Sequence, residues 1–468
     1  MLICYIRQYK NHGENVNLFA ELALISEDWA HNVRISIGND GKIKDIEIGV
    51  EPDKDDKKLI NRILLPAMSN LHSHSFQRSM AGITEKRTKK QDSFWNWRKI
   101  MYDFIEKLNP EHIEAIAALV FMEMLESGYA SVGEFHYIHH QQGGIQYENV
   151  TETSTSIFSA AIQTGIGLTH LPVFYMQGGL NGEIFSQVQL RFKNNSEQYL
   201  RILEQIENEI QRASKDYMLG LAPHSLRAVS PESLKDIISS KQFLPVHIHI
   251  AEQQKEVKDF KYIYGQRPVN WLLDNINIDS QWCLIHATHL LLEETAKLAN
   301  SGAVVGLCPI TEANLGDGIF DGSEYISYGG KFGIGSDSNV HITLTGELRM
   351  LEYSQRLSLK ERNIMNNISG SLGKSLYTNA LRGGAQALSR NSGTIASGKW
   401  ADLLTLDSKA LAFYCSSEDE ILDRWIFTAD DSLVREVWSA GRPVVVDGRH
   451  IKHDQIEKHY RKIIRKLY

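Results

Sequence analysis

An apolar run that ends in two histidines constrains this chain more than any other feature. Residues 63–71 are mostly apolar and lead directly into His72-Ser73-His74. Because side chains alternate across a β-strand, both imidazoles lie on one face of the strand end. Two neutral imidazoles held in this way are half of a metal site. A pair of hydrogen-bonded histidines inside a barrel would give the same short pattern, so the rest of the chain has to decide.

Three further apolar runs downstream end in polar residues that can bind a metal or move a proton. They are residues 243–252, with His247, His249 and Glu252, then residues 282–286, ending in His286, and residues 331–337, ending in Asp337. In a (β/α)8 barrel the catalytic groups lie at the carboxyl ends of the strands. Four such runs therefore predict side chains that converge on one rim of a barrel.

The segments between these runs support the same fold class. A helix is predicted from Pro110, followed by an acidic first turn, to near Gly128, and a strand over 130–135 follows. Amphipathic patterns predict further helices over 196–213 and 290–300. Alternating strands and helices indicate an α/β fold with a parallel sheet and crossover helices.

The two ends of the chain are rich in short β-like runs, and Asn39-Asp40-Gly41 is a hairpin signal. The 468 residues also exceed the ~250 of a plain barrel. We therefore predict a barrel over residues 63–394 and one small β domain assembled from residues 1–62 and 395–468, the latter ending in a helix.

Composition excludes several classes of protein. The net charge of −7 argues against a nucleic-acid surface. The sequence shows neither an apolar stretch of membrane-spanning length nor a secretion signal, which predicts a soluble protein with no membrane partner. Its four cysteines lie far apart and are typical of reduced thiols, so we expect a cytoplasmic location.

Five motifs resemble those of the amidohydrolase superfamily, and among its members the formimidoylglutamate deiminases are the closer match. The motifs are residues 70–78, 220–227, 247–253, 308–318 and 335–339. The resemblance implies a (β/α)8 TIM-like barrel with a small β-sandwich domain built from both chain ends.

The resemblance also implies a metal site. It assigns the ligands His72, His74, His249 and Asp337, a donor set that suits Zn²⁺. His247 competes with His249, but the motif favours His249 because Glu252 then follows three residues later, where related deaminases carry a proton-shuttling glutamate. A second metal would need a bridging lysine, and His224 stands in the matching region. We therefore expect one zinc per chain.

Three residues are predicted to carry the chemistry. Zinc would lower the pKa of a bound water to ~7, and Asp337 would accept its proton. Glu252 would protonate the leaving nitrogen as general acid, and His286 would orient or polarise the attacked carbon. The alternatives are that Asp337 caps a helix and that Glu252 lies on a helix surface.

Five residues match positions that bind substrate in the family. They are Gln77, Arg98, Tyr137, His224 and Arg227. Arginine binds carboxylates through two parallel hydrogen bonds, as a substrate with two carboxylates requires. Solvated arginines and a core tyrosine are the alternatives.

The sequence therefore predicts a zinc hydrolase that deiminates N-formimino-L-glutamate in histidine degradation, with a small dicarboxylate as substrate and a homodimer as the assembly. One alternative is an aminohydrolase of a heterocycle such as guanine, which shares the metal motif. An alternative of another class is an inactive barrel kept as a scaffold. The intact set of metal and proton-transfer residues argues against the scaffold.

Overall fold

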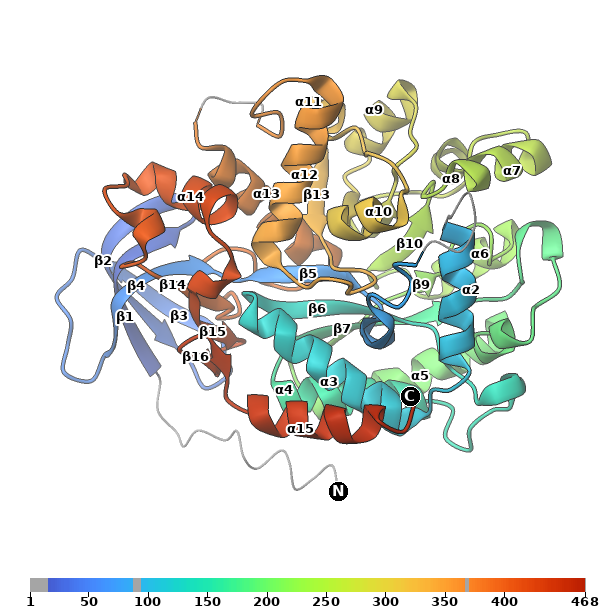
Figure 1. Ribbon diagram of the computed structural model, residues 1–468, viewed down its shortest axis with the longest axis horizontal. Helices are drawn as coiled ribbons and strands as arrows, with labels where there is room; N and C mark the ends of the chain where they lie inside the picture. The colour runs from blue at the N-terminus through green and yellow to red at the C-terminus, as the bar shows by residue number, and fades with distance from the viewer. Residues whose placement is uncertain (1–15, 87–93, 367–369, 468) are drawn as a thin grey trace.

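The computed structural model describes residues 16–86, 94–366 and 370–467, and its centre is a parallel barrel (Figure 1). The barrel strands are β5 (Met68–Ser73), β6 (Tyr129–His136), β7 (Gly167–Phe174), β8 (Met218–Leu219) with β9 (Ala222–Pro223), β10 (Val246–Ile250), β11 (Trp282–His286), β12 (Val304–Leu307) and β13 (Lys331–Ile334). Parallel bridges between Ser225 and His249 and between Ser73 and Asp337 close the circle. The predicted (β/α)8 fold is confirmed.

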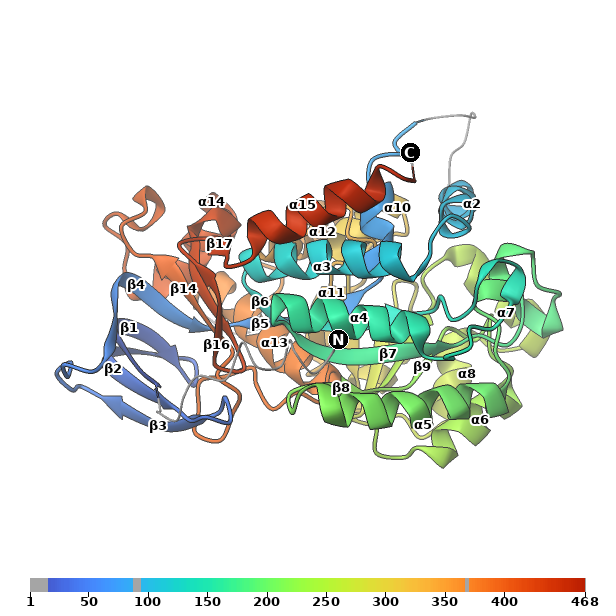
Figure 2. The same cartoon turned by 90° about the horizontal axis from the view of Figure 1, so that it is seen from below.

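Helices surround the barrel, as crossover connections between parallel strands require (Figures 1 and 2). They are α3 (Pro110–Glu126), α4 (Glu152–Thr164), α5 (Ser196–Ala213), α6 (Pro231–Ser240), α7 (Gln254–Tyr264), α8 (Pro268–Asn275), α9 (Leu292–Asn300), α10 (Pro309–Leu315), α11 (Gly322–Ser327), α12 (Leu344–Leu359) and α13 (Leu372–Ala387). A further helix, α2 (Phe94–Ile105), lies beside the barrel mouth, and the described residues contain no helix long and apolar enough to cross a membrane.

Local signals explain where the predicted helices begin. In α3, Asn109 and His112 form a reciprocal capping pair and Pro110 occupies the first turn, where its missing N–H has no cost. In α5, Asn195 and Gln198 form the same kind of pair. The predictions of helices at both places are confirmed.

The chain ends form a separate sheet of eight strands in the order β17-β16-β15-β14-β4-β1-β2-β3. The strands are β1 (Val16–Ile25), β2 (Asp28–Ile37), β3 (Ile43–Ile48), β4 (Lys57–Pro66), β14 (Leu403–Asp407), β15 (Val434–Ser439), β16 (Arg442–Val446) and β17 (Arg449–His450). The predicted hairpin at residues 39–41 joins β2 and β3, and residues of both chain ends share one apolar core. The prediction of a β domain built from both ends is confirmed.

Several connections among the described residues hold this sheet to the barrel, and two of them tie it to the barrel strands. Only Ala67 separates β4 of the sheet from β5 of the barrel. In addition, the buried carboxylate of Asp216, just before β8, binds Arg390 and Arg442. The remaining helices are α14 (Ile421–Thr428) and α15 (His453–Ile464), the predicted C-terminal helix, which packs along α3 (Figure 2).

Candidate metal centre and active site

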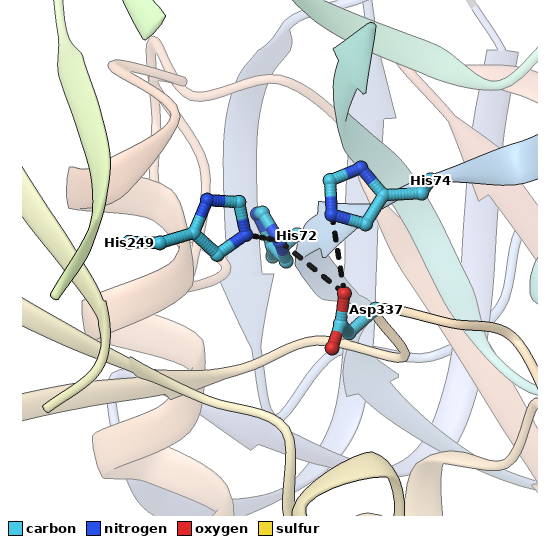
Figure 3. Close-up of side chains that lie close together, drawn as sticks. All are labelled: His72, His74, His249 and Asp337. Atoms are coloured by element: carbon cyan, nitrogen blue, oxygen red, sulfur yellow. Dashed lines mark hydrogen bonds and ion pairs between the residues drawn. The ribbon is translucent and has the colours of Figure 1, made fainter. Parts of the chain in front are cut away.

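The predicted metal ligands come from three places on one barrel rim. His72 lies near the end of β5 and His74 just beyond it, His249 lies near the end of β10, and Asp337 follows β13. Asp337 has φ of +42°, in the left-handed region that non-glycine residues rarely adopt. Backbone strain of this kind is common where a side chain is held for function, and here it accompanies a carboxylate that points at the histidines (Figure 3).

The distances among these side chains fit one small cation. The Nε2 atoms of His72 and His249 lie 3.1 Å apart, and Asp337 Oδ1 lies 3.5 Å from His72 Nε2 and 3.3 Å from His74 Nε2. All four ligand atoms lie within 4.8 Å of one another (Figure 3). Two atoms at zinc–nitrogen distance and a tetrahedral angle are roughly 3.3 Å apart. The group is therefore able to bind a metal.

The protonation states of the ligands support the same interpretation. Backbone carbonyls accept hydrogen bonds from Nδ1 of His74, at Phe135, and from Nδ1 of His249, at His224, which leaves each Nε2 as a lone-pair donor to a metal. Burial lowers the pKa of His72 to about 3, so its imidazole is neutral at pH 7. Burial would raise the pKa of Asp337, but the hydrogen bond with His72 and the nearby His74 lower it below its usual range.

His247, the competing residue, lies outside this group. Its Nε2 contacts the carbonyl of Ala387 at 2.8 Å and its side chain is buried. It therefore serves a structural purpose deeper in the barrel.

A polar network that the sequence analysis missed holds the loop after β13. Asn70 donates to Ser336 Oγ at 2.7 Å, and Ser336 Oγ donates to Asn339 at 2.6 Å. Asn339 in turn donates to the carbonyls of His74 and Asp337, at 3.1 Å each. The signal was present, because Asn70 and Asn339 belong to the motifs quoted above, but only the folded chain brings them together.

Glu252 lies at the start of the segment that follows β10 and is buried rather than on a helix surface. Burial raises its pKa, opposed by His286 and Arg227. Arg227 Nη2 lies 3.6 Å from Glu252 Oε2, and Glu256, buried one turn later, accepts the Glu252 backbone N–H. The carboxyl group therefore keeps its proton to a higher pH than an exposed glutamate would.

His286 ends β11 with φ of +66° and lies 3.9 Å, through Nε2, from Asp337 Oδ2. Its Nδ1 lies 3.2 Å from Glu312 Oε1. Burial opposes the charge, but the hydrogen bond with Glu312 and the carboxylate of Glu252 raise the pKa of His286 to about 10. The imidazole is thus a hydrogen-bond donor toward the metal group.

One pocket joins the metal group to the residues predicted to bind substrate. Its walls contain Gln77, Arg98, Tyr137, His224 and Arg227, together with His74, His249, Glu252, His286 and Asp337. A larger cavity of about 670 Å³ lies beside α13 and contains none of these residues. Chemistry rather than size therefore identifies the candidate site.

Arg98 has an unusual environment for a cation. Its Nε donates to Tyr102 at 2.7 Å and its Nη2 to Tyr175 at 3.2 Å. Among the described residues it has no acidic partner, whereas Arg227 lies near Glu252 and Glu256. The sequence analysis missed both tyrosines. Tyr102 could have been found from its i,i+4 spacing on the helix of Arg98, but Tyr175 carries no local signal.

Comparisons with known proteins agree with this geometry. Residues 63–444 match the model of the amidohydrolase family, and residues 16–59 match the model described as "Formimidoylglutamate deiminase HutF, N-terminal domain". The formimidoylglutamate deiminase of Pseudomonas aeruginosa is 46% identical over 96% of this chain and 99% of its own length.

Solved structures show the same fold. An amidohydrolase from Brucella melitensis is 44% identical with a TM-score of 0.92, over 97% of this chain and 99% of that one. An adenosine deaminase from Xanthomonas campestris with bound zinc, 19% identical, has a TM-score of 0.80 over 97% and 98%. The chain therefore belongs to the amidohydrolase family, in the branch that includes the formimidoylglutamate deiminases.

Proposed function

We propose that this protein hydrolyses N-formimino-L-glutamate to N-formyl-L-glutamate and ammonia in histidine degradation. The observation that carries the proposal is Arg98, a cation with only neutral described partners in the pocket of the metal group. Such a group favours an anionic ligand. The relative from Pseudomonas aeruginosa, a formimidoylglutamate deiminase, supports the same substrate.

The metal in this proposal is one zinc ion per chain, held by His72, His74, His249 and Asp337. Neutral imidazoles and one ionised carboxylate are the donors that zinc prefers. When bound, zinc supplies Lewis-acid activation of a water molecule, whose pKa falls to ~7. The remaining chemistry belongs to the side chains of this chain.

Asp337 accepts the proton of the attacking water, because it lines the pocket and its Oδ2 lies toward His286. His286 donates a hydrogen bond to the oxygen that adds to the formimino carbon and orients it. Glu252 protonates the imino nitrogen as the new carbon–oxygen bond forms. The proton held by Asp337 then passes to the same nitrogen and Glu252 takes back the hydroxyl proton, so the carbon–nitrogen bond breaks to release ammonia, a far better leaving group than amide ion, and the hydroxyl oxygen becomes the formyl carbonyl.

Recognition of the glutamate part falls to the remaining polar walls of the pocket. Arg98 and Arg227 are assigned to the two carboxylates, with Gln77, Tyr137 and His224 as further contacts. Arg227 also lies near Glu252, which couples binding of one carboxylate to the position of the general acid.

Three further features complete the proposal. The small domain comprises residues 1–62 and 395–468, as predicted, together with residues 63–66, which complete strand β4 of its sheet, and the barrel extends from there to residue 394. The enzyme is a homodimer, and it acts in the cytoplasm. Deamination of a heterocycle such as guanine is the competing function, favoured by the aromatic walls Phe94 and Trp97.

Ammonia release from purified protein tests the proposal directly. The panel contains formiminoglutamate, guanine and cytosine, and the metal content of the same sample is measured. Release from formiminoglutamate alone is the expected result. Release from guanine with none from formiminoglutamate would transfer the proposal to the heterocycle.

A further inference from the structure

Two tyrosines and a glutamine form a hydrogen-bonded chain behind Arg98. Arg98 Nε donates to the Tyr102 hydroxyl at 2.7 Å, and Arg98 Nη2 donates to the Tyr175 hydroxyl at 3.2 Å. Gln189 Nε2 lies 3.1 Å from the same Tyr175 hydroxyl. The two phenols therefore contact the same guanidinium group.

Backbone groups fix which way the Gln189 amide points. Its Oε1 accepts the N–H of Ser186 at 2.9 Å, and its Nε2 donates to the carbonyl of Gly178 at 2.9 Å. In the flipped orientation, the amide NH₂ would face the N–H of Ser186, a second donor, and the amide oxygen would face the carbonyl of Gly178, a second acceptor. Gln189 therefore donates to Tyr175, and its orientation leaves no second possibility.

Counting hydrogens then assigns every bond in the chain. A phenol oxygen has two acceptor sites and one hydrogen. Tyr175 uses both acceptor sites, for Arg98 and Gln189, so it has no site left to accept a hydrogen bond from Tyr102. Tyr102 accepts from Arg98, and its own hydrogen is left over.

The remaining hydrogen of the Tyr102 hydroxyl can find its acceptor in the substrate pocket. Tyr102 and Arg98 both line the substrate pocket, and no described side chain or carbonyl accepts the Tyr102 hydrogen. Burial raises the pKa of Tyr102, so the phenol keeps its hydrogen at neutral pH. The subsite thus presents guanidinium N–H groups and a phenol O–H side by side, and all of them are donors.

We propose that Tyr102 donates a hydrogen bond to the substrate carboxylate held by Arg98 and so determines specificity, and that Tyr175 and Gln189 are positioning residues that enforce this direction. The inference rests on the proposed function, because it assumes a carboxylate in this pocket. A subsite that offers only donors can donate hydrogen bonds to both oxygens of a carboxylate. It gives the NH₂ group of a carboxamide no acceptor.

The test compares Tyr102→Phe and Gln189→Leu with Tyr325→Phe. Tyr325 is a matched control, since among the described residues its buried hydroxyl donates to the backbone carbonyls of Ala303 and Lys331, at the amino-terminal ends of β12 and β13. Each zinc-loaded variant is assayed with formiminoglutamate and with the two analogues in which one carboxylate is a carboxamide. Binding of glutarate is measured by calorimetry in parallel, and thermal denaturation checks folding.

Tyr102→Phe is expected to reduce kcat/KM for formiminoglutamate at least about tenfold, mainly through KM, as loss of one hydrogen bond to a charged group does. Selectivity over one of the two carboxamides should fall, and glutarate should bind at least about tenfold more weakly. Gln189→Leu should give a smaller loss of the same kind, because Tyr102 can then donate to Tyr175. In the double variant Gln189→Leu should add nothing.

An unchanged carboxylate-to-carboxamide ratio in Tyr102→Phe, with folding intact, would overturn the proposal. A further loss of kcat/KM when Gln189→Leu is added to Tyr102→Phe would also overturn the proposal. If Tyr102→Phe does not fold, the carboxylate-to-carboxamide ratio of Gln189→Leu alone tests the proposal. Failure of the proposed function is distinguishable, because wild-type protein would then release no ammonia from formiminoglutamate while glutarate binding still reports on the subsite.

Discussion

The Nε2 atoms of His72 and His249 face each other 3.1 Å apart inside the barrel mouth. Because Nδ1 of His249 donates to the carbonyl of His224, its Nε2 carries no hydrogen, and burial keeps both imidazoles neutral. Nδ1 of His72 has no hydrogen-bond partner among the described residues. Two neutral ring nitrogens at this distance suit either a hydrogen bond donated by His72 or a cation shared by both.

The first prediction concerns metal content. Purified protein should contain about one zinc per chain, lose activity on chelation and recover it when zinc is added. His249→Ala should lose most of the metal, whereas His247→Ala should retain it because His247 contacts Ala387 instead. Elemental analysis of each variant provides the measurement. Two metals per chain, or full activity in His249→Ala, would contradict the assignment.

The second prediction concerns Glu252 as general acid. Glu252→Gln keeps the size and hydrogen-bonding capacity of the side chain but removes its acidic proton, so kcat should fall at least ~10²-fold while zinc content is unchanged. Steady-state kinetics and metal analysis on the same preparation measure both quantities. Glu232→Gln, at an exposed residue of α6, is the control and should behave as wild type. A near-normal kcat in Glu252→Gln would assign proton transfer to another group.

The third prediction separates the two arginines. Removing one partner of a desolvated charge pair typically costs ~2–5 kcal/mol, so Arg98→Met and Arg227→Met should each reduce kcat/KM for formiminoglutamate at least roughly tenfold with metal content unchanged. Arg98→Met should act mainly on KM, because Arg98 contacts phenols. Arg227→Met should also reduce kcat, because Arg227 lies 3.6 Å from Glu252.

Analogues that lack one carboxylate identify the partner of each arginine. For each variant, kcat/KM should fall little further when the analogue lacks the carboxylate that the replaced arginine binds. It should fall much further when the analogue lacks the other carboxylate. Arg449→Met, at an exposed arginine paired with Asp454, is the control and should not change selectivity. If both pocket variants treat the analogues as wild type does, the dicarboxylate pocket is wrong and a heterocyclic substrate is the better hypothesis.

The fourth prediction concerns stability and pH. Burial would raise the pKa of Asp216, but Arg442 and Arg390 lower it below its usual value. A carboxylate with a depressed folded-state pKa stabilises the protein above its unfolded pKa of ~3.9 and loses that contribution as the pH falls below it. Asp216→Asn should therefore destabilise the protein at pH 7 by ~3–5 kcal/mol, because Arg442 loses its carboxylate partner and the buried Arg390 keeps Asp402 alone.

Denaturant unfolding between pH 7 and pH 3 measures this effect. The difference between wild type and Asp216→Asn should shrink as the pH falls below about 4, where the wild-type carboxylate begins to lose its contribution. Asp454→Asn removes the exposed partner of Arg449 and should change stability by less than ~1 kcal/mol. Equal effects of the two substitutions would show that the buried ion pairs of Asp216 contribute no more to the free energy of unfolding than an exposed pair.

Much of the fold could be predicted because its signals are local. Alternating apolar residues, the proline at the start of α3 and the turn at residues 39–41 act through neighbours in sequence, and α3 and the β2–β3 hairpin formed where they were expected. The apolar run over 63–71, in contrast, is divided at Ala67 between the terminal sheet and the barrel. The resemblance of short motifs also indicated which side chains to examine. The strain at Asp337 and His286 could not be predicted in this way, since only packing against the rest of the rim maintains a positive φ.

By itself the sequence determined the barrel class, the β domain formed from both ends and the set of side chains available for a metal and a dicarboxylate, because periodicity and motif spacing are properties of the chain. Only the tertiary structure decided which of them meet. It brought His249 rather than His247 to within 3.1 Å of His72, joined Asn70 to Ser336, and surrounded Arg98 with phenols from two elements. Such contacts depend on the closure of the barrel, which brings residues hundreds of positions apart to one rim.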